Sequence, residues 1–418
     1  MQFTVTKTTA ACLLMLAGTF SAQAQTAETK AAAVPESDSL TGPTFNTPTG
    51  KPAVNVAPVA PGAYDLAGIG RRDATQETIL TEPVSGVPVR FENGVFVFPS
   101  AVVGLGHNDN VIGVAAGKIS SLITSIQPRV VAEVKKSGDR YTLTYNGNLT
   151  QYANSSADNV NSHEFTLAGD NYFSARSRLG WSAAYISNAD PRGTTDRVQS
   201  AEPDRWHAPV LQGKYIYGAK GAQGRFEVDG GLQAKRYDNN RLFTVASDVD
   251  IQSVAGRFYW RVMPKTSAVF ELRHITSDYK LATSLNDNRD TRVLVGLEWD
   301  AAAKTTGSFK IGHQSKNFDS SVMKDASAAT YEGAIKWSPL TYSVVEATIG
   351  RAAADSTGVG DYTTNTSANL AWTHKWKSYL TSRVTAGTIK SDFANASRSD
   401  TQRYIGVGVF YELNRNFR

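Results

Sequence analysis

Apolar and polar residues alternate along most of the chain, from about Phe91 to its last residue. In the stretch 225–235, Phe226, Val228 and Leu232 share one face, and the charged residues fall on the other. A repeat of two residues is that of a β-strand, whose successive side chains point to opposite faces. Strands with one apolar and one polar face, repeated through a long chain, are typical of a barrel with lipid outside and water inside. The pattern therefore predicts an all-β, transmembrane, antiparallel up-and-down β-barrel over residues 91–418.

Turn residues between the alternating stretches divide this region into about sixteen strands. The predicted strands start near Val95, Ser120, Arg140, Ser162, Arg176, Ala208, Gln223, Ile251, Lys265, Thr291, Thr305, Ala328, Thr341, Thr363, Tyr379 and Arg403. Short turns such as 136–139 alternate with longer polar loops such as 188–206. Short turns on one rim and long loops on the other are typical of outer-membrane barrels, with the short turns in the periplasm.

The last predicted strand, 403–413, leaves two accounts of how the barrel ends. Its lipid-facing residues are Ile405, Val407, Val409, Tyr411 and Leu413. The first account is a complete barrel of about sixteen strands with a short tail. The second is a barrel of about eighteen strands with the last hairpin missing. It would leave an open edge, which lipid does not tolerate because the edge N–H and C=O groups find no partner.

Two segments precede the predicted barrel. Residues 1–24 have a basic start, an apolar run and a small-residue ending, which is the layout of a cleavable signal peptide. The only cysteine, Cys12, lies inside this segment, so the exported chain can form no disulfide. Residues 25–90 are rich in Pro, Ala and Thr and predict a disordered periplasmic linker. The linker could reach a periplasmic polysaccharide-export component, or it could plug the lumen. Together these features predict the outer membrane of a Gram-negative cell.

Composition and motifs narrow the function. The hydrophobic share of 41% is low for a membrane protein, but only alternate barrel residues meet lipid. The net charge of +5 comes from mixed acidic and basic residues, so no clustered footprint for nucleic acid is present. The six histidines are not at metal-ligand spacing, and no hydrolase or phosphate-loop motif occurs. We therefore expect no enzyme, no metal and no cofactor; a membrane-embedded hydrolase that uses Ser and His is a third alternative, but no pairing of such residues stands out in the sequence. The stretch 104–110 could suggest a calcium loop, but its Asn and Asp residues more often form turns.

Alternation also assigns charged residues of both signs to the lumen. Most of them are expected to fill the wall as salt-bridged ladders. The pore-lining candidates are Arg225, Glu227, Asp229, Arg257, Tyr259, Arg261, Glu271 and Arg273. Sixteen strands leave an aqueous channel, so the last five of these could form a selective stripe that contacts a polar solute. The loop 188–206 could fold in as a constriction or bind glycans through Asp190, Arg192, Asp196, Arg197, Glu202, Asp204 and Arg205.

Four tryptophans recur close to the short turns. Trp260, Trp299, Trp337 and Trp376 follow one another at spacings of 38 or 39 residues. Indole suits the headgroup region because it is apolar and carries one N–H group. The alternative is aromatic packing inside a soluble barrel, but placement at one rim favours an interfacial belt.

Four short motifs, in order, resemble those of the EpsL-type proteins, which are β-barrel porins encoded with bacterial exopolysaccharide synthesis systems. The motifs are FENGVFVFP at 91–99, GLGHNDN at 104–110, EPDRWH at 202–207 and KRYDNN at 235–240. The resemblance runs from Pro88 to the end of the chain. It implies an outer-membrane protein that serves polysaccharide synthesis or export, and it brings no catalytic residue. Proteins of this kind usually continue for about one more hairpin, which favours the second account of the C-terminus.

Two classes of function follow. In the first, the barrel conducts, either as the outer-membrane exit pore for the polysaccharide or as a general solute porin. In the second, it is a non-conducting accessory barrel that anchors loops or docks the export machinery.

Overall fold

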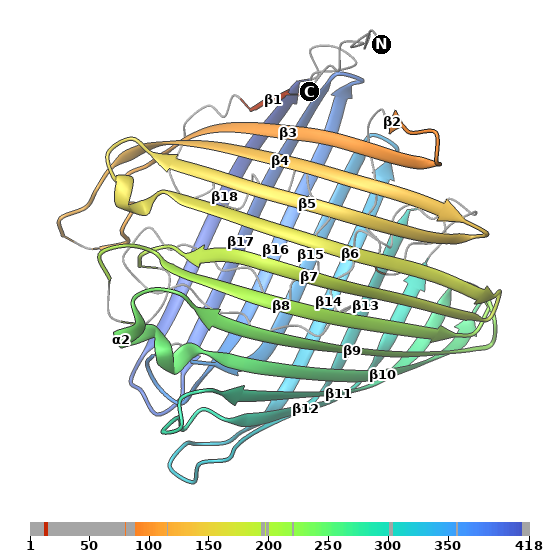
Figure 1. Cartoon of the computed structure of the whole chain (residues 1–418). Coiled ribbons are helices and arrows are strands. Elements are labelled where there is room, and N and C mark those ends of the chain that lie inside the picture. The colour runs from red at the N-terminus through yellow and green to blue at the C-terminus, as the bar shows by residue number, and fades with distance from the viewer. Residues whose placement is uncertain are drawn as a thin grey trace, which may run out of the picture.

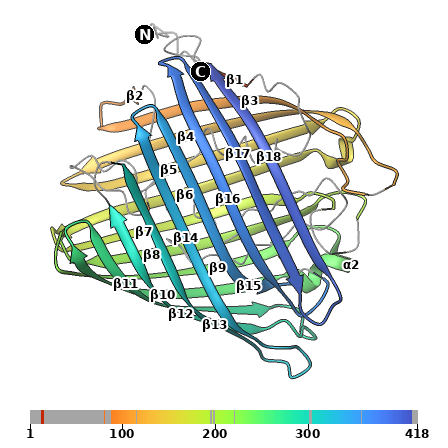
Figure 2. The same ribbon diagram turned by 180° about the vertical axis from the view of Figure 1, so that it is seen from behind.

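A computed structural model describes residues 12–15, 80, 88–114, 116–193, 197, 200–219, 221–300, 304–356 and 358–411. Sixteen long strands follow one another around a single curved wall, each antiparallel to the next (Figures 1 and 2). The strands are β3 (Val95–Asn108), β4 (Ser121–Lys136), β5 (Asp139–Tyr152), β6 (Val160–Ser174), β7 (Ser177–Asp190), β8 (Asp204–Tyr217), β9 (Gly224–Tyr237), β10 (Val249–Met263), β11 (Thr266–Tyr279), β12 (Asn288–Asp300), β13 (Thr305–Phe318), β14 (Ala326–Leu340), β15 (Ser343–Asp355), β16 (Tyr362–Lys377), β17 (Leu380–Phe393) and β18 (Ser399–Tyr411). Each predicted strand start lies within four residues of an observed one, which confirms the predicted barrel architecture.

The connections separate into two rims. Two-residue turns join β4 to β5, β10 to β11 and β16 to β17 at one rim, and the loops between β7 and β8 and between β9 and β10 lie at the other (Figure 1). The long-loop rim also carries three short helical turns, η1 (Ser156–Asp158), α2 (Arg241–Thr244) and η2 (Val245–Ser247). In the part of the chain that the structure describes, no helix combines the length and apolarity needed to cross a membrane.

The two faces of the wall differ as the alternation predicts. On β9, Phe226 and Leu232 are 44% and 51% exposed on the outer face. Glu227 and Asp229 point inward and are almost fully buried. The same division holds on β18, where Ile405 and Val407 are exposed on the outer face. Leu413 lies outside the described residues.

Aromatic side chains mark the short-turn rim. Trp260, Trp337 and Trp376 are exposed on the outer face, and each lies within four residues of the end of its strand, next to a short turn. Trp299 occupies the same position on β12, with its ring over Gly307 of β13. This outer-face position is the one that a headgroup-level aromatic belt requires.

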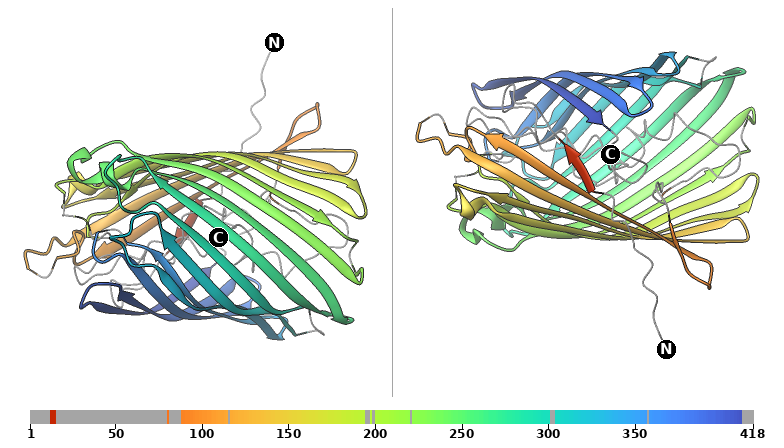
Figure 3. Two further views of the ribbon diagram at one scale, coloured as in Figure 1. Left: turned by 90° about the horizontal axis from the view of Figure 1, so that it is seen from below. Right: turned by 90° about the horizontal axis from the view of Figure 1, so that it is seen from above.

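The sheet curls until its last strands approach β3 (Figure 3). Among the described residues, however, no ladder of paired residues joins β18 to β3, because β18 pairs with β17 alone. On the free side of β3 lies the two-residue strand β2 (Val89–Arg90), which pairs with Phe96 and Val97. The described sheet is therefore open between β18 and β3.

The predicted N-terminal segments fall almost entirely outside the described residues. The exceptions are β1 (Cys12–Met15), which pairs in parallel with β3, residue 80, and residues 88–90. Cleavage of the predicted signal peptide would remove β1 from the exported chain. Val89 and Arg90, which the sequence assigned to the linker, instead pair with the wall, because the turn at 91–94 folds them back onto β3. Gly94, at φ +82°, makes that turn.

Candidate functional site

The densest group of charges faces the lumen from β9, β10 and β11. Strand register places Arg257 directly between Glu227 and Glu271. The Arg257 Nε atom lies 3.2 Å from Glu271 Oε2, and its Nη1 atom donates to Asp229. Adjacent strands thus present alternate charges to one another, as cross-strand pairs on one face do.

This group continues onto β13 and β14. Arg273 Nη2 lies 2.5 Å from Glu271 Oε1 and 3.2 Å from Glu332 Oε1. Lys310 Nζ lies 2.6 Å from Glu271 Oε2 and also contacts Glu332. Glu271 is therefore shared by three cations, and Glu332 by two.

The group also extends to β12 through Arg225 and to β8 through Glu227. Arg225 Nε lies 3.0 Å from Glu227 Oε1, and its Nη2 atom lies 3.5 Å from Glu298 Oε1. Its guanidinium also stacks on the Tyr259 ring, 4.0 Å from the ring centroid. Lys214 of β8 completes the set, 3.2 Å from Glu227 Oε2.

We call this set the lumen ladder. Its ten charged members lie on seven consecutive strands, β8 to β14, and comprise five cations and five carboxylates. They are Lys214, Arg225, Glu227, Asp229, Arg257, Glu271, Arg273, Glu298, Lys310 and Glu332. The ladder carries no net charge, so it attracts neither cations nor anions as a class.

Burial divides the ladder into an inner and an accessible part. Arg257, Glu271 and Arg273 are each no more than 3% exposed, so their charges are satisfied by one another. Arg225 and Glu298 are 25% and 32% exposed at the side chain and lie near the short-turn ends of their strands. A solute in the lumen would therefore meet these two before it met the central residues.

Seven of the eight pore-lining candidates belong to this arrangement, six as ladder members and Tyr259 as the platform under Arg225. Arg261 shares the inner face with Arg257 and Tyr259, because it pairs in register with Ser267, but it is not a member of the ladder. Its Nη1 atom donates to the Gly221 carbonyl at the exposed short-turn rim. Arg261 lies two residues before the end of β10, so its side chain reaches the rim and not the central residues of the ladder.

The wall outside β8–β14 carries fewer ion pairs and more neutral polar groups. Arg383 of β17 lies 3.3 Å from Glu346 of β15. Tyr404 Oη donates to Asn369 Oδ1 at 2.7 Å, and Ser391 Oγ donates to Asn365 Oδ1 at 2.7 Å. This part of the lumen thus offers hydroxyl and amide groups of the kind that sugars also carry.

At the long-loop rim, Arg197 forms ion pairs with residues at the end of β7 and at the start of β8. Asp190 and Asp204 are cross-strand partners. Arg197 Nη2 lies 3.0 Å from Asp190 Oδ2 and 2.8 Å from Asp204 Oδ2. Its Nη1 atom donates to Tyr237 Oη at 3.2 Å and to Ser247 Oγ at 3.3 Å. One loop cation therefore bridges two carboxylates that would otherwise repel each other, and Lys235 Nζ, 3.6 Å from Asp190 Oδ2, offsets the second negative charge. We call the contact of Arg197 with Asp190 and Asp204 the clamp.

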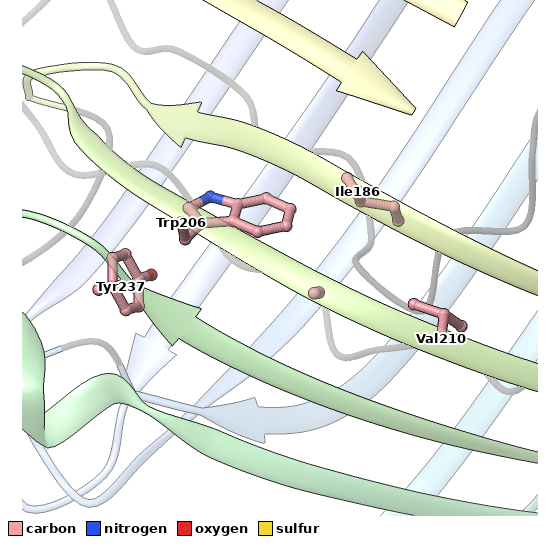
Figure 4. Close-up of a cluster of buried hydrophobic side chains, with 5 residues drawn as sticks. Ile186, Trp206, Val210 and Tyr237 are labelled. Carbon is pink, nitrogen blue, oxygen red and sulfur yellow. The ribbon is translucent and has the colours of Figure 1, made fainter. Parts of the chain in front are cut away.

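An apolar cluster lies beneath this clamp on the inner face of β7, β8 and β9. It contains Ile186, Trp206, Ala208, Val210 and Tyr237 (Figure 4). Trp206 Nε1 donates to Asp190 Oδ1 at 2.9 Å, which ties the cluster to the clamp. Sequence reasoning missed this cluster. The alternation along β8 could have revealed it, because the pattern that places Asp204 on the inner face places Trp206 there as well.

The other described candidates in the loop 188–206 make contacts elsewhere and do not touch the clamp. Arg192 Nε donates to Asp158 Oδ1 at 2.8 Å, and its neighbour Gly193 packs backbone to backbone on Gly113. Arg205 is exposed and pairs with Glu202 at 3.2 Å. Asp196 lies outside the described residues. The described part of this loop is thus bound to the rim at two places, one near β9 and one at the loops that precede β4 and β6.

The two buried loop guanidiniums stay charged. Burial lowers the pKa of Arg197, but the nearby Tyr237, Asp190 and Asp204 raise it by more than burial lowers it. The pKa of Arg197 is therefore above its ordinary value. For Arg192, the hydrogen bond to Asp158 raises the pKa above its ordinary value. Both guanidiniums therefore remain cations where they meet their carboxylate partners.

The stretch 104–110 ends in a turn. Asn110 accepts from the Val114 amide at 3.1 Å and donates to the Val114 carbonyl at 2.8 Å, and Asn108 Oδ1 accepts from the Asn110 amide. Within the described ranges, no three His, Cys, Asp or Glu side chains form a group that could hold a metal ion.

Comparisons with known proteins place the chain among barrels. Residues 88–418 match the model of the family described as "Putative beta-barrel porin 2". No curated protein matches the sequence. Among solved structures, the FrpB iron transporter from Neisseria meningitidis is similar at 10% identity and a TM-score of 0.43, over 69% of this chain and 58% of that one. The siderophore receptor PiuA from Acinetobacter baumannii is similar at 10% identity and a TM-score of 0.43, over 78% of this chain and 67% of that one.

Proposed function

The chain belongs to the "Putative beta-barrel porin 2" family, and from this premise we propose that it is the outer-membrane exit pore of an exopolysaccharide export system. The observation that carries the proposal is the neutral lumen ladder on β8–β14, beside a wall of hydroxyl and amide groups. A polymer rich in hydroxyl groups can exchange hydrogen bonds with such a wall. A lumen of balanced charge neither holds nor repels it as an ion.

The barrel size supports transport. About sixteen strands are wide enough to leave an aqueous channel, whereas eight would fill with their own side chains. The accessible pairs, Arg225–Glu298 and Arg383–Glu346, lie towards the short-turn end, where a polymer would enter from the periplasm. The motifs at 91–99 and 202–207 supply the link to exopolysaccharide systems through their resemblance to the EpsL-type proteins.

Two observations favour the second candidate, a non-conducting accessory barrel. The central ladder residues are buried, with Arg273 at 0% exposed. The Leu80 amide also donates to Asp170 Oδ1 at 2.7 Å on the inner face of β6, so at least this residue of the preceding segment lies against the lumen wall. A lumen that is occupied on this side would not conduct until the contact is released.

Two measurements separate these candidates. Conductance of the purified full chain in planar bilayers tests for a pore, and small sugars as blockers test for a general solute porin. A deletion strain that makes polymer without displaying it on the surface would support the export proposal. Normal surface polymer in that strain, together with a conducting barrel, would favour the general porin. No conductance under any condition would favour the accessory barrel.

A further inference from the structure

On the outer face of β9–β13, cations near the long-loop rim have carboxylate partners. Arg236 Nη2 lies 2.6 Å from Asp250, and Lys280 Nζ lies 2.9 Å from the same carboxylate. Arg289 lies 3.3 Å from Asp319. Each of these cations is therefore offset within the protein.

The outer face of β15–β18 differs. Register places Arg351, Thr366, Lys390 and Thr401 in one row across the four strands. Arg403 lies two residues from Thr401 along β18, on the same face and nearer the apolar band. The row spans three strand spacings, about 14 Å.

These side chains point towards the lipid. Ile349 and Ile405 lie two residues from Arg351 and Arg403, share their faces, and are 40% and 60% exposed on the outer surface. Lys390 is exposed as well, at 54% of its side chain. We call Arg351, Lys390 and Arg403, with Thr366 and Thr401 between them, the rim patch.

The rim patch carries an excess of positive charge. Its one carboxylate is Asp392, which lies 2.8 Å from Lys390 Nζ. Within the described part of the chain, neither Arg351 nor Arg403 has a carboxylate at ion-pair distance; Arg351 Nη1 donates to the Ala329 carbonyl. Three cations against one carboxylate give the patch a net charge of +2.

A lipid-facing cation is costly unless it reaches the interface or meets an anion. Arginine side chains extend along apolar surface to place the guanidinium at headgroup level. Guanidinium groups bind phosphate through paired hydrogen bonds, and the threonine hydroxyls between them add further donors. The long-loop rim of such a barrel faces the outer leaflet.

We infer that the rim patch on β15–β18 binds the phosphate groups of a glycolipid in the outer leaflet. This site lies on the opposite side of the wall from the lumen ladder, and it does not depend on what passes through the lumen. It would hold β17 and β18, the last strands of the described sheet, against the membrane interface.

The test uses the purified full chain in detergent, with diphosphorylated lipid A added as the probe. We expect lipid A to raise the Tm, and inorganic phosphate at the same phosphate concentration to leave it unchanged. The triple variant Arg351→Gln/Lys390→Gln/Arg403→Gln should lose most of this rise. Native mass spectrometry should show several-fold less bound lipid A in that variant.

The matched control removes three cations that already have partners, Arg236→Gln/Lys280→Gln/Arg289→Gln. This control should bind lipid A as the wild type does. If the triple variant folds poorly, the single variant Arg403→Gln replaces it, and Arg403→Lys should retain part of the binding. Equal lipid A binding by the rim-patch and control variants, or an equal rise with inorganic phosphate, would overturn the inference. Surface polymer in the rim-patch variant is a separate readout, so failure here leaves the export proposal standing.

Discussion

Arg273 and Glu332 lie 3.2 Å apart although 59 residues and two intervening strands separate them. The Arg273 side chain crosses the inner face of β12 and β13 to reach Glu332 on β14, while it also holds Glu271 on its own strand. This contact joins β11 to β14 through side chains, in addition to the backbone ladders between the strands. Its burial makes it a structural element of the wall more than a binding surface.

The first prediction concerns this contact. Arg273→Met should destabilise the barrel, because it leaves buried Glu271 and Glu332 with one cation fewer. Breaking a buried ion pair from one side costs about 3–5 kcal/mol, and we expect the lower end because Lys310 still contacts both carboxylates. Guanidinium unfolding in lipid vesicles measures the change. The double variant Arg273→Met/Glu332→Leu should recover part of the loss, and a fully stable single variant would contradict the structure.

A second prediction concerns the clamp at the long-loop rim. Arg197→Ala leaves the cross-strand pair Asp190 and Asp204 without their shared cation, so the two carboxylates repel and the loop between them loosens. Proteases added to intact cells should then cut within 191–203 faster than in the wild type. Arg205→Ala is the control, since its exposed pair with Glu202 contributes about 0–1 kcal/mol. Equal cleavage in the two variants would show that the clamp does not hold the loop.

A third prediction tests which face of β9 meets lipid. Leu232 lies near the middle of β9 on the outer face, so Leu232→Arg should destabilise the folded barrel by about 2–4 kcal/mol, as expected for a cation at the bilayer midplane. Leu232→Ala is the control and should cost less. Unfolding in vesicles provides the measurement. If Arg and Ala cost the same, this strand does not face hydrocarbon.

The strands could be predicted from the sequence because the residues that define each strand lie within it or next to it. Alternation sets the faces, and turn residues set the ends, so both signals lie within a dozen residues of the strand they describe. That is why the outward positions of Phe226 and Ile405 follow from the sequence alone.

The charge partners could not be predicted in the same way. Arg225 and Glu298 are 73 residues apart in sequence, and they meet only because of the register and curvature of the intervening strands. Alternation places Arg261 on the inner face, as its pairing with Ser267 does, but it could not show that the side chain binds the Gly221 carbonyl of the neighbouring turn. Burial of Arg257 is equally non-local, since it depends on carboxylates from β9 and β11.

The last prediction concerns ion selection in the lumen. Arg383 and Glu346 form an accessible pair, 25% and 27% exposed at the side chain. Arg383→Glu changes the local charge by two units. At about 7 Å in water one unit charge changes the energy of a passing ion by about 0.6 kcal/mol, so two units shift a cation and an anion in opposite directions by about 1.2 kcal/mol each. Screening at a Debye length of about 8 Å reduces each shift to about 0.5 kcal/mol, so the cation-to-anion permeability ratio should rise about fivefold. Reversal potentials in a potassium chloride gradient across planar bilayers measure this ratio.

The control for this prediction is the swapped pair, Arg383→Glu/Glu346→Arg. It keeps both the net charge and the ion pair, so its selectivity should return to that of the wild type. A parallel series at several salt concentrations should show the effect of Arg383→Glu shrinking as salt rises, because screening weakens the field of a lumen charge. If Arg383→Glu conducts with unchanged selectivity, the ion path avoids β15–β17 and the pair belongs to the wall alone.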